Sequence, residues 1–225
     1  LKDAASCAIY GARGANGVIV ITTKRGHAGD VQVDYDGYAG WKTLTHETKL
    51  LDGQDLAELI NEEMYNANPS RTDYMKGLSD PESIGKGYNM FDTMKRTGSY
   101  QKHNVSISGR TENANFRVTG IYSTDIPTFI KEKYENSSLN FVSDFKKGIF
   151  TFGETATVTR NMHNWNESIL MLALKWSTCC PIYDPTSSTG YAGAGLGTDL
   201  ANERAVADYT WDKSETNSMT GNGWI

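Results

Sequence analysis

Alternating apolar and polar residues from Tyr100 to His163 constrain this chain more than any other feature of the sequence. Four segments carry the pattern, namely residues 104–110, 115–123, 138–145 and 150–159. Successive side chains of a β-strand point to opposite faces, so each segment predicts a strand with one apolar and one polar face. Three residues, Ile121, Val142 and Glu154, break the alternation.

Short and long connections alternate between these four predicted strands. Residues 111–114 join the first pair and residues 146–148 join the last pair, as in tight hairpins. A longer piece, residues 125–133, separates the second strand from the third. A soluble sandwich has no reason to place all its short turns at one end, whereas a transmembrane barrel has short turns on one side and long loops on the other.

An earlier segment, residues 31–41, also alternates and predicts a further strand. Asp34 and Asp36 share one face of it, and carboxylates facing lipid are costly, so this face is expected to line a wet interior. Trp41 at the strand end is typical of an aromatic girdle. A solvent-facing strand on a soluble sheet fits the same residues equally well.

Composition excludes several function classes. The net charge of −5 indicates neither a nucleic-acid surface nor a basic arm for membrane surfaces. The mean hydropathy is negative, and no apolar run approaches the 18 or so residues of a membrane helix. The alternating strands of a membrane barrel give only a weak hydropathy signal, so this absence does not argue against one.

The titratable and nucleophilic residues do not form a recognisable site. Cys7, Cys179 and Cys180 make neither a disulfide framework nor a zinc motif, and small apolar fillers are the expected role. The histidines lie in unrelated settings, and no Ser/His/Asp set or pair of carboxylates has a telling spacing. We therefore predict no enzyme activity, no metal and no cofactor. The four histidines are His27, His46, His103 and His163.

Two helices are predicted outside the strands. Asp55 is positioned to cap a helix that runs to about Tyr65 and presents Leu56, Leu59, Ile60 and Met64 on one face. The acidic side chains of Glu58, Glu62 and Glu63 then form a solvated face rather than a metal site. Residues 167–177 are also apolar and compatible with a helix, but too short to span a bilayer.

The first residues predict a helix over 1–10 that ends at Gly11, followed by a glycine-rich turn and a strand over 18–24. Phosphate-binding loops need the reverse order, a strand followed by a turn and then a helix. Asn16 and Gly17 are therefore interpreted as a tight turn that leads into a buried strand.

Residues 1–26, LKDAASCAIYGARGANGVIVITTKRG, resemble the end of the plug domain in TonB-dependent outer-membrane receptors of the SusC/RagA type. Arg13, Gly14, Asn16 and Gly17 belong to the matching signature, whereas Cys7 stands where a small residue is expected. Residues 100–123, YQKHNVSISGRTENANFRVTGIYS, resemble the second and third barrel strands of the same family. Residues 181–195, PIYDPTSSTGYAGAG, resemble one of its loop motifs.

The resemblance implies a mainly β fold, a fragment of a plugged antiparallel transmembrane barrel of about 22 strands. Residues 1–29 would be the C-terminal end of the plug, and residues 30–225 the N-terminal part of the barrel with helix-containing extracellular loops. It also implies a Gram-negative, Bacteroidetes-like outer membrane and import of glycans or peptides with energy from the TonB complex. A SusD-like surface lipoprotein is the expected partner, and membrane lipid surrounds the barrel.

Four aromatic residues near the second predicted helix are candidates for substrate binding: Trp165, Trp176, Tyr183 and Tyr191. Their rings could stack on the apolar faces of sugars. The alternative, which is favoured for aromatic residues in such a loop, is that they pack the loop against the barrel wall or the plug. The alternative for the chain as a whole is a soluble β-rich binding or adhesion module, which explains the strands but neither the alternation of connections nor residues 1–26.

Overall fold

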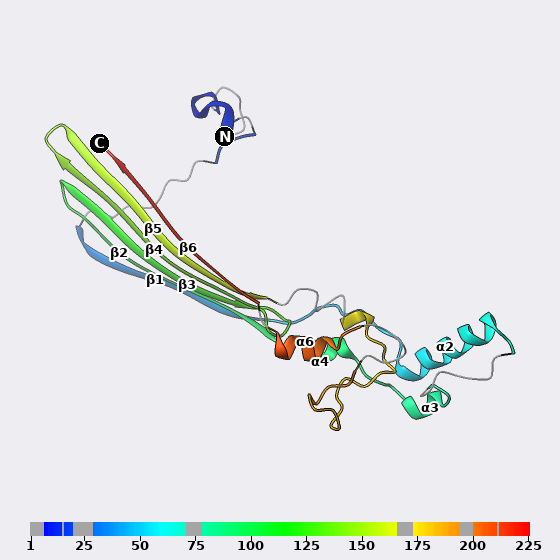
Figure 1. The fold of residues 1–225 in the computed structure, drawn as a ribbon. Helices are drawn as coiled ribbons and strands as arrows, with labels where there is room; N and C mark the ends of the chain where they lie inside the picture. Colours follow the sequence, from blue (N-terminus) through cyan, green and yellow to red (C-terminus); the bar gives the residue numbers. More distant parts are fainter. Residues whose placement is uncertain are drawn as a thin grey trace.

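The computed structural model describes residues 7–14, 16–19, 29–70, 78–165, 173–193, 200–210 and 212–225. Its main element is one antiparallel sheet of six strands, which follow one another in chain order (Figure 1). The mainly β fold predicted from the sequence is confirmed. The strands are β1 (Gly29–Lys42), β2 (Gly98–Arg110), β3 (Ala114–Ile126), β4 (Lys133–Lys147), β5 (Phe150–Trp165) and β6 (Asp212–Trp224).

The two ends of the sheet differ in their connections. Residues 111–113 and 148–149 form tight turns at one end, which we call the turn end, and Gly148 adopts a φ of 62° there. The long connections that follow β1, β3 and β5 leave from the opposite end, the loop end, where the α-helices lie (Figure 1). The predicted alternation of short and long connections is therefore confirmed.

Strand register sorts the side chains onto two faces, because directly paired residues lie on the same face. One face, the apolar face, carries pairs such as Val33 with Ile107 and Phe145 with Phe152. The opposite face, the polar face, carries pairs such as Asn140 with Thr157. Among the described elements the strands pack only against one another, so no second layer of the described chain covers either face.

β6 was not predicted, and its sequence explains why. Its side chains on the apolar face are those of Lys213, Glu215, Asn217 and Met219, followed by Gly221 and Gly223. Only Met219 is apolar, so no hydrophobic alternation marks the strand. Backbone pairing with β5, which runs from Gly153 opposite Trp224 to Trp165 opposite Asp212, places β6 in the sheet.

The described α-helices lie beyond the loop end, and we refer to them with the described loops around them as the cap (Figure 1). The predicted helix 55–65 is α2, but Asp52 rather than Asp55 caps it, since the Asp52 carboxylate accepts a hydrogen bond from the Asp55 amide at 2.9 Å. Within the described ranges, none of the helices has the length and apolarity that crossing a bilayer demands. The helices are α2 (Gly53–Ala67), α3 (Pro81–Ile84), α4 (Met90–Met94) and α6 (Glu203–Tyr209).

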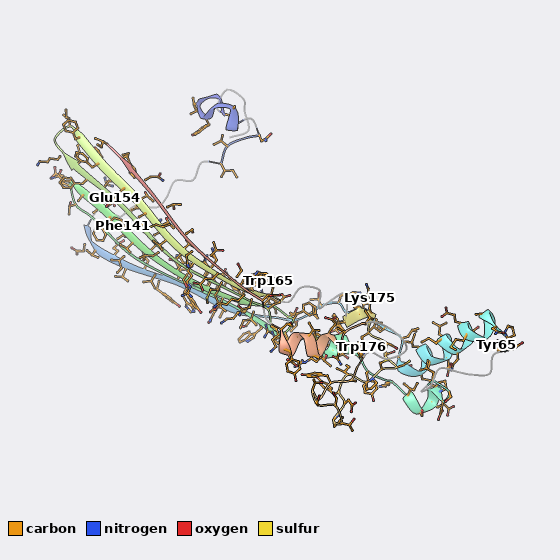
Figure 2. All side chains as sticks on the ribbon, viewed as in Figure 1. Tyr65, Phe141, Glu154, Trp165, Lys175 and Trp176 are labelled. Atoms are coloured by element: carbon orange, nitrogen blue, oxygen red, sulfur yellow. The ribbon has the colours of Figure 1, made fainter. Side chains whose placement is uncertain are left out.

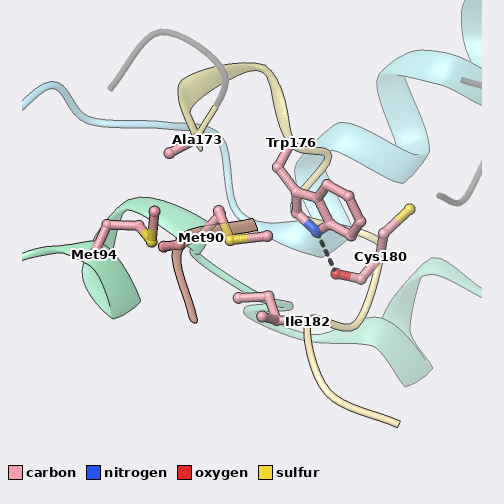
Figure 3. Close-up of a cluster of buried hydrophobic side chains, with 7 residues drawn as sticks. Met90, Met94, Ala173, Trp176, Cys180 and Ile182 are labelled. Carbon is pink, nitrogen blue, oxygen red and sulfur yellow. Dashed lines mark hydrogen bonds between the residues drawn. The ribbon is translucent and has the colours of Figure 1, made fainter. Parts of the chain in front are cut away.

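A compact hydrophobic core lies in the cap rather than against the sheet (Figure 3). It joins α4, α6 and the segment between β5 and β6, and Trp176 is its largest side chain. The indole Nε1 of Trp176 donates a hydrogen bond to the carbonyl of Cys180 at 3.1 Å, which satisfies the only polar group of a buried ring. The members are Met90, Met94, Ala173, Trp176, Cys180, Ile182 and Ala207.

The N-terminal elements differ from the prediction where they are described. Residues 8–14 form the 3₁₀ helix η1 (Ala8–Gly14), interrupted at Gly11, whose φ is 67°. The Gly17 amide donates a hydrogen bond to the Gly14 carbonyl at 2.9 Å, which confirms the tight turn at Asn16 and Gly17. The remainder of the predicted helix 1–10 and most of the predicted strand 18–24 lie outside the described residues, and Val18 and Ile19 are not in a strand.

Candidate functional site

The polar face of the sheet is held together by a ladder of side-chain hydrogen bonds between β4 and β5. The amide Nδ2 of Asn136 donates to Oδ1 of Asn161 at 2.7 Å, and that of Asn140 donates to Oγ1 of Thr157 at 2.7 Å. Between these pairs, the hydroxyls of Ser138 and Thr159 lie 3.1 Å apart. This part of the face is hydrophilic, as the sequence predicted.

The aspartates of β1 lie on this polar face. Arg117 of β3 donates a hydrogen bond from Nη2 to the Ser106 hydroxyl at 2.6 Å and approaches the Asp34 carboxylate at 3.7 Å. Asp34 is therefore paired across two strand boundaries instead of facing an apolar surface. Two of the exceptions to the alternation, Ile121 and Val142, lie on the polar face, whereas Glu154 lies on the apolar face.

Aromatic rings gather on the polar face near the loop end, and we call Tyr38, Tyr100, Tyr134, His163 and Trp165 the aromatic row. On β1 and β2, the ring centroids of Tyr38 and Tyr100 lie 5.2 Å apart. On β4 and β5, the Tyr134 ring stacks on His163 at 3.9 Å, and His163 lies 4.9 Å from Trp165. Trp165 thus stands at the end of a set of rings that strand register brings together.

A charged pair occupies the gap between the two halves of the aromatic row. Asp125 of β3 is directly paired with both Tyr100 and Tyr134, and it forms an ion pair with Lys42 of β1. The Lys42 ammonium also lies 5.5 Å from the centroid of the Tyr100 ring, in a cation–π contact. The row therefore offers flat apolar surfaces beside hydrogen-bonding groups.

Trp176, another predicted binding residue, lies in the cap and not beside Trp165 (Figure 2). Only 4% of its surface is exposed, because the core of the cap surrounds it. Its ring faces are consequently inaccessible to a ligand in this structure. The packing role that the sequence left open is the one the geometry favours for this residue.

Tyr183 and Tyr191 are brought together by an isolated β-bridge, with ring centroids 5.6 Å apart. The Tyr191 hydroxyl donates to the Asp208 carboxylate of α6, which raises the pKa of Tyr191. Arg204 also contacts Asp208, with Nε at 2.8 Å and Nη2 at 3.3 Å. Tyr191 is therefore committed to an internal network, whereas Tyr183 remains 51% exposed.

Asn202 anchors the loop that carries these tyrosines. Its buried amide donates to the carbonyls of Ile182 at 2.7 Å and Ala192 at 3.0 Å, while its Oδ1 accepts the Ala205 amide and caps α6. One side chain thus closes the loop and starts the helix that supplies Asp208. Tyr183 is held in place by this arrangement.

A hollow of about 560 Å³ opens beside Tyr183 between α4 and the segments that precede α2 and α6. It is lined by aromatic, carboxamide, carboxylate and ammonium groups, a mixture that can hydrogen-bond a polar ligand while packing on its apolar surfaces. The polar and aromatic lining comprises Asp52, Lys86, Tyr88, Asn89, Asp92, Thr93, Thr178 and Tyr183.

The structure therefore separates the four predicted binding residues into two places, the aromatic row with Trp165 and the cap with Trp176, Tyr183 and Tyr191. No sequence pattern singled out the other members of the row, Tyr38, Tyr100, Tyr134 and His163. A count of strand positions from each turn would have placed Tyr134 opposite His163, since the turn at residues 148–149 fixes that register. No local pattern identifies the residues that line the hollow.

Comparison with known proteins gives a consistent result. The TonB-dependent receptor P3 of Formosa agariphila is 25% identical over 236 aligned positions, which cover 99% of this chain and 22% of that receptor. The TonB-dependent receptor SusC of Bacteroides thetaiotaomicron is 27% identical over 199 positions, 84% of this chain and 19% of SusC. The chain spans about a fifth of the length of these curated relatives.

A further receptor of Formosa agariphila, the TonB-dependent receptor P26, is 30% identical over 119 positions, or 52% of this chain and 12% of that receptor. No protein-family model matches the chain. Each of the similarities concerns the same kind of receptor.

Proposed function

We propose that this chain is part of an outer-membrane importer of large nutrients, because it is similar over most of its length to TonB-dependent receptors, SusC among them. In this proposal the sheet is a section of barrel wall, with the apolar face against lipid and the polar face towards the interior. Residues 1–29 belong to the plug, and residues 30–225 to the wall and its extracellular loops. The TonB complex supplies the energy.

The observation that carries the proposal is the pair of unlike faces on a single sheet that no other described element covers. Val33 and Val31 on the apolar face are 67% and 62% exposed, and Leu139 is 53% exposed. Such a surface is unfavourable in water and suits hydrocarbon. From Leu139 to Phe145 the apolar band of β4 covers six residue steps, about 20 Å at about 3.3 Å per residue, near the ~25 Å band of membrane barrels. One polar pair interrupts it, since the Ser143 hydroxyl donates a hydrogen bond to the Glu154 carboxylate at 3.1 Å.

The loop end then faces the outside of the cell, and the cap lies at the mouth of the barrel. We propose that Trp165 with the aromatic row contacts the substrate at the rim, and that Tyr183 contacts it in the hollow of the cap. Tyr191 supports Tyr183 from behind, and Trp176 holds the cap together. Flat rings beside carboxylate and carboxamide groups suit glycans, and peptides are the second substrate class.

The cap is also the surface we propose for a SusD-like lipoprotein lid, since it is the part of the described chain that projects beyond the wall. A soluble adhesion module is the alternative function. It is not favoured, because its apolar strands would need a covering layer and the described chain supplies none.

The test is growth of a strain that lacks the full-length receptor gene, on a panel of glycans and peptides as sole nutrients. We expect the loss of growth on one class and its recovery with the wild-type gene. Trp165→Ala and Tyr183→Ala should each slow uptake of that nutrient about ten-fold at low concentration, as for loss of about 1.4 kcal/mol of binding.

Trp41→Ala is the matched control. Trp41 belongs to the same sheet, but its side chain lies on the opposite, apolar face and is 83% exposed. Its uptake should match the wild type. Equal uptake by the Trp165 and Trp41 variants would contradict the proposal that the aromatic row contacts the substrate. Unimpaired growth of the deletion strain on the whole panel would refute the import function.

A further inference from the structure

A shallow groove of about 490 Å³ lies on the apolar face of the sheet, across β2, β3, β4 and β5. Two adjacent register rows form it. The row nearer the turn end is entirely apolar, with Val105, Gly120, Leu139 and Val158 in direct pairing. The row nearer the loop end is polar or amphipathic, with His103, Tyr122, Ser137 and Arg160 in direct pairing.

Gly120 creates the groove. A Cβ atom at this position would meet no heavy atom within 4 Å, so the surface is open above the glycine. Val105 and Leu139 on the neighbouring strands are 43% and 53% exposed and form the walls. The floor therefore presents only hydrocarbon and backbone, and it can receive a narrow apolar chain.

The polar row is preorganised by contacts along the same face. The Tyr35 hydroxyl lies 2.7 Å from Nδ1 of His103, and the Tyr122 hydroxyl donates to Glu135 at 3.1 Å. Arg160 forms an ion pair with Glu215 at 2.9 Å, but Glu215 also lies 3.9 Å from Lys213. One carboxylate is thus shared by two cations.

The charge beyond the apolar floor is consequently positive. In the polar row and the two rows further towards the loop end, the described strands carry Arg160, Lys133 and Lys213 against Glu135 and Glu215 on this face. Arg160 is the cation that lines the groove itself. The groove therefore has an apolar floor on one side and a cationic lip on the other, which is the pattern of an amphiphile with an anionic headgroup.

We propose that this groove is a binding site for one membrane lipid, with an acyl chain over Gly120 and an anionic headgroup at Arg160. The proposal rests on the proposed function, because it requires the apolar face to meet hydrocarbon. The orientation agrees with that function, since the headgroup lies on the loop-end side of the apolar band. Bulk lipid would need neither the depression nor the cationic lip.

The experiment uses the full-length receptor in nanodiscs of equal parts phosphatidylglycerol and phosphatidylcholine, with native mass spectrometry of the lipid that the released protein retains. The wild type should retain one phosphatidylglycerol in preference to phosphatidylcholine. Gly120→Val fills the groove, and we expect retention to fall about ten-fold, since each lost methylene contact lowers partitioning about four-fold.

Three further variants separate the acyl site and the headgroup site from general effects of substitution. Gly221 lies on the same face outside the groove, and a Cβ there would meet only the Thr155 carbonyl at 3.7 Å, so Gly221→Val should retain lipid like the wild type. Arg160→Gln should retain lipid without a preference for phosphatidylglycerol, whereas Glu215→Gln, which frees Arg160, should keep that preference.

Equal retention by the Gly120 and Gly221 variants, or a phosphatidylglycerol preference that survives Arg160→Gln, would overturn the site. Either result in a receptor that inserts into nanodiscs and restores growth contradicts the lipid site alone. A receptor that does not enter nanodiscs contradicts the proposed function and the lipid site together.

Discussion

The packing of the cap requires a residue without a side chain at Gly87. Its φ is 66°, and a Cβ atom would lie 2.1 Å from the Thr178 carbonyl oxygen and 2.9 Å from the Gly53 Cα. Both obstacles are backbone atoms, so side-chain rotation cannot relieve the overlap. Gly87 thereby allows the start of α2 and the segment after Trp176 to lie against each other.

Gly87→Ala is predicted to destabilise the cap by more than about 2 kcal/mol, because it adds steric overlap to left-handed strain. Amide hydrogen exchange of α2 and of residues 176–182 in the full-length receptor measures the effect. Gly85→Ala is the matched control: φ is 59° there, but a Cβ would meet nothing within 4 Å. It should cost only about 1–2 kcal/mol. Equal effects of the two substitutions would contradict the close contact.

At the scale of elements, α6 carries two carboxyl groups with opposite pKa shifts. Burial alone would raise the pKa of Asp208, but hydrogen bonds from Tyr191 and Arg204 outweigh it and lower that pKa. Glu203 is buried, and burial raises its pKa. Because its pKa is lowered, the ionised Asp208 carboxylate stabilises the cap at pH values above the ordinary aspartate pKa of about 3.9. This stabilisation is lost as the pH falls through the pKa of Asp208 in the folded state.

The sign for Glu203 is the reverse, because a buried acid with a raised pKa favours the protonated form. Its contribution to stability declines as the pH rises from the ordinary glutamate value of about 4.3 through the folded value. Glu203→Gln should therefore increase hydrogen-exchange protection of α6 at pH 7 and change it little below pH ~4. The exposed Glu63→Gln should have no effect on α6. Weaker protection of α6 in Glu203→Gln at pH 7 would refute this assignment.

At the scale of the whole molecule, the two faces of the sheet predict unequal costs for an added charge. Phe141 lies in the apolar band and Asn140, its neighbour in β4, on the polar face. Phe141→Arg places a cation in hydrocarbon and should cost about 2–4 kcal/mol, whereas Asn140→Arg loses mainly the hydrogen bond to Thr157, about 1 kcal/mol. Urea unfolding of the full-length receptor in bilayers compares them, and a costlier Asn140→Arg would reverse the assignment of the faces.

Much of the sheet follows from local pattern, whereas the cap does not. The alternation in β2 to β5 identified four strands, and the carboxylates of Asp34 and Asp36 marked the polar face of β1. The sequence predicted Asp55 as the N-cap of α2, whereas the structure shows Asp52. Both are aspartates and suit an N-cap, so residue type alone could not distinguish them. β6 escaped because only Met219 among its side chains on the apolar face is apolar.

The candidate site was predicted only in part. Residue type alone singled out Trp165, Trp176, Tyr183 and Tyr191, and aromatic residues serve equally well in cores and in binding surfaces. Burial distinguishes them: Trp176 is inside the core, and Tyr183 is half exposed beside a hollow. Burial depends on residues far away in the chain, such as Met90 and Ala207 for Trp176.

The sequence by itself determined which side chains share a face, since that follows from the two-residue period of a strand and requires no knowledge of its neighbours. Only the tertiary structure decided which side chains from distant segments lie next to one another. It placed Tyr134 against His163, opened the groove above Gly120 and enclosed Trp176, because register and packing are set by contacts between distant segments, and a shift of one residue would turn every side chain to the opposite face.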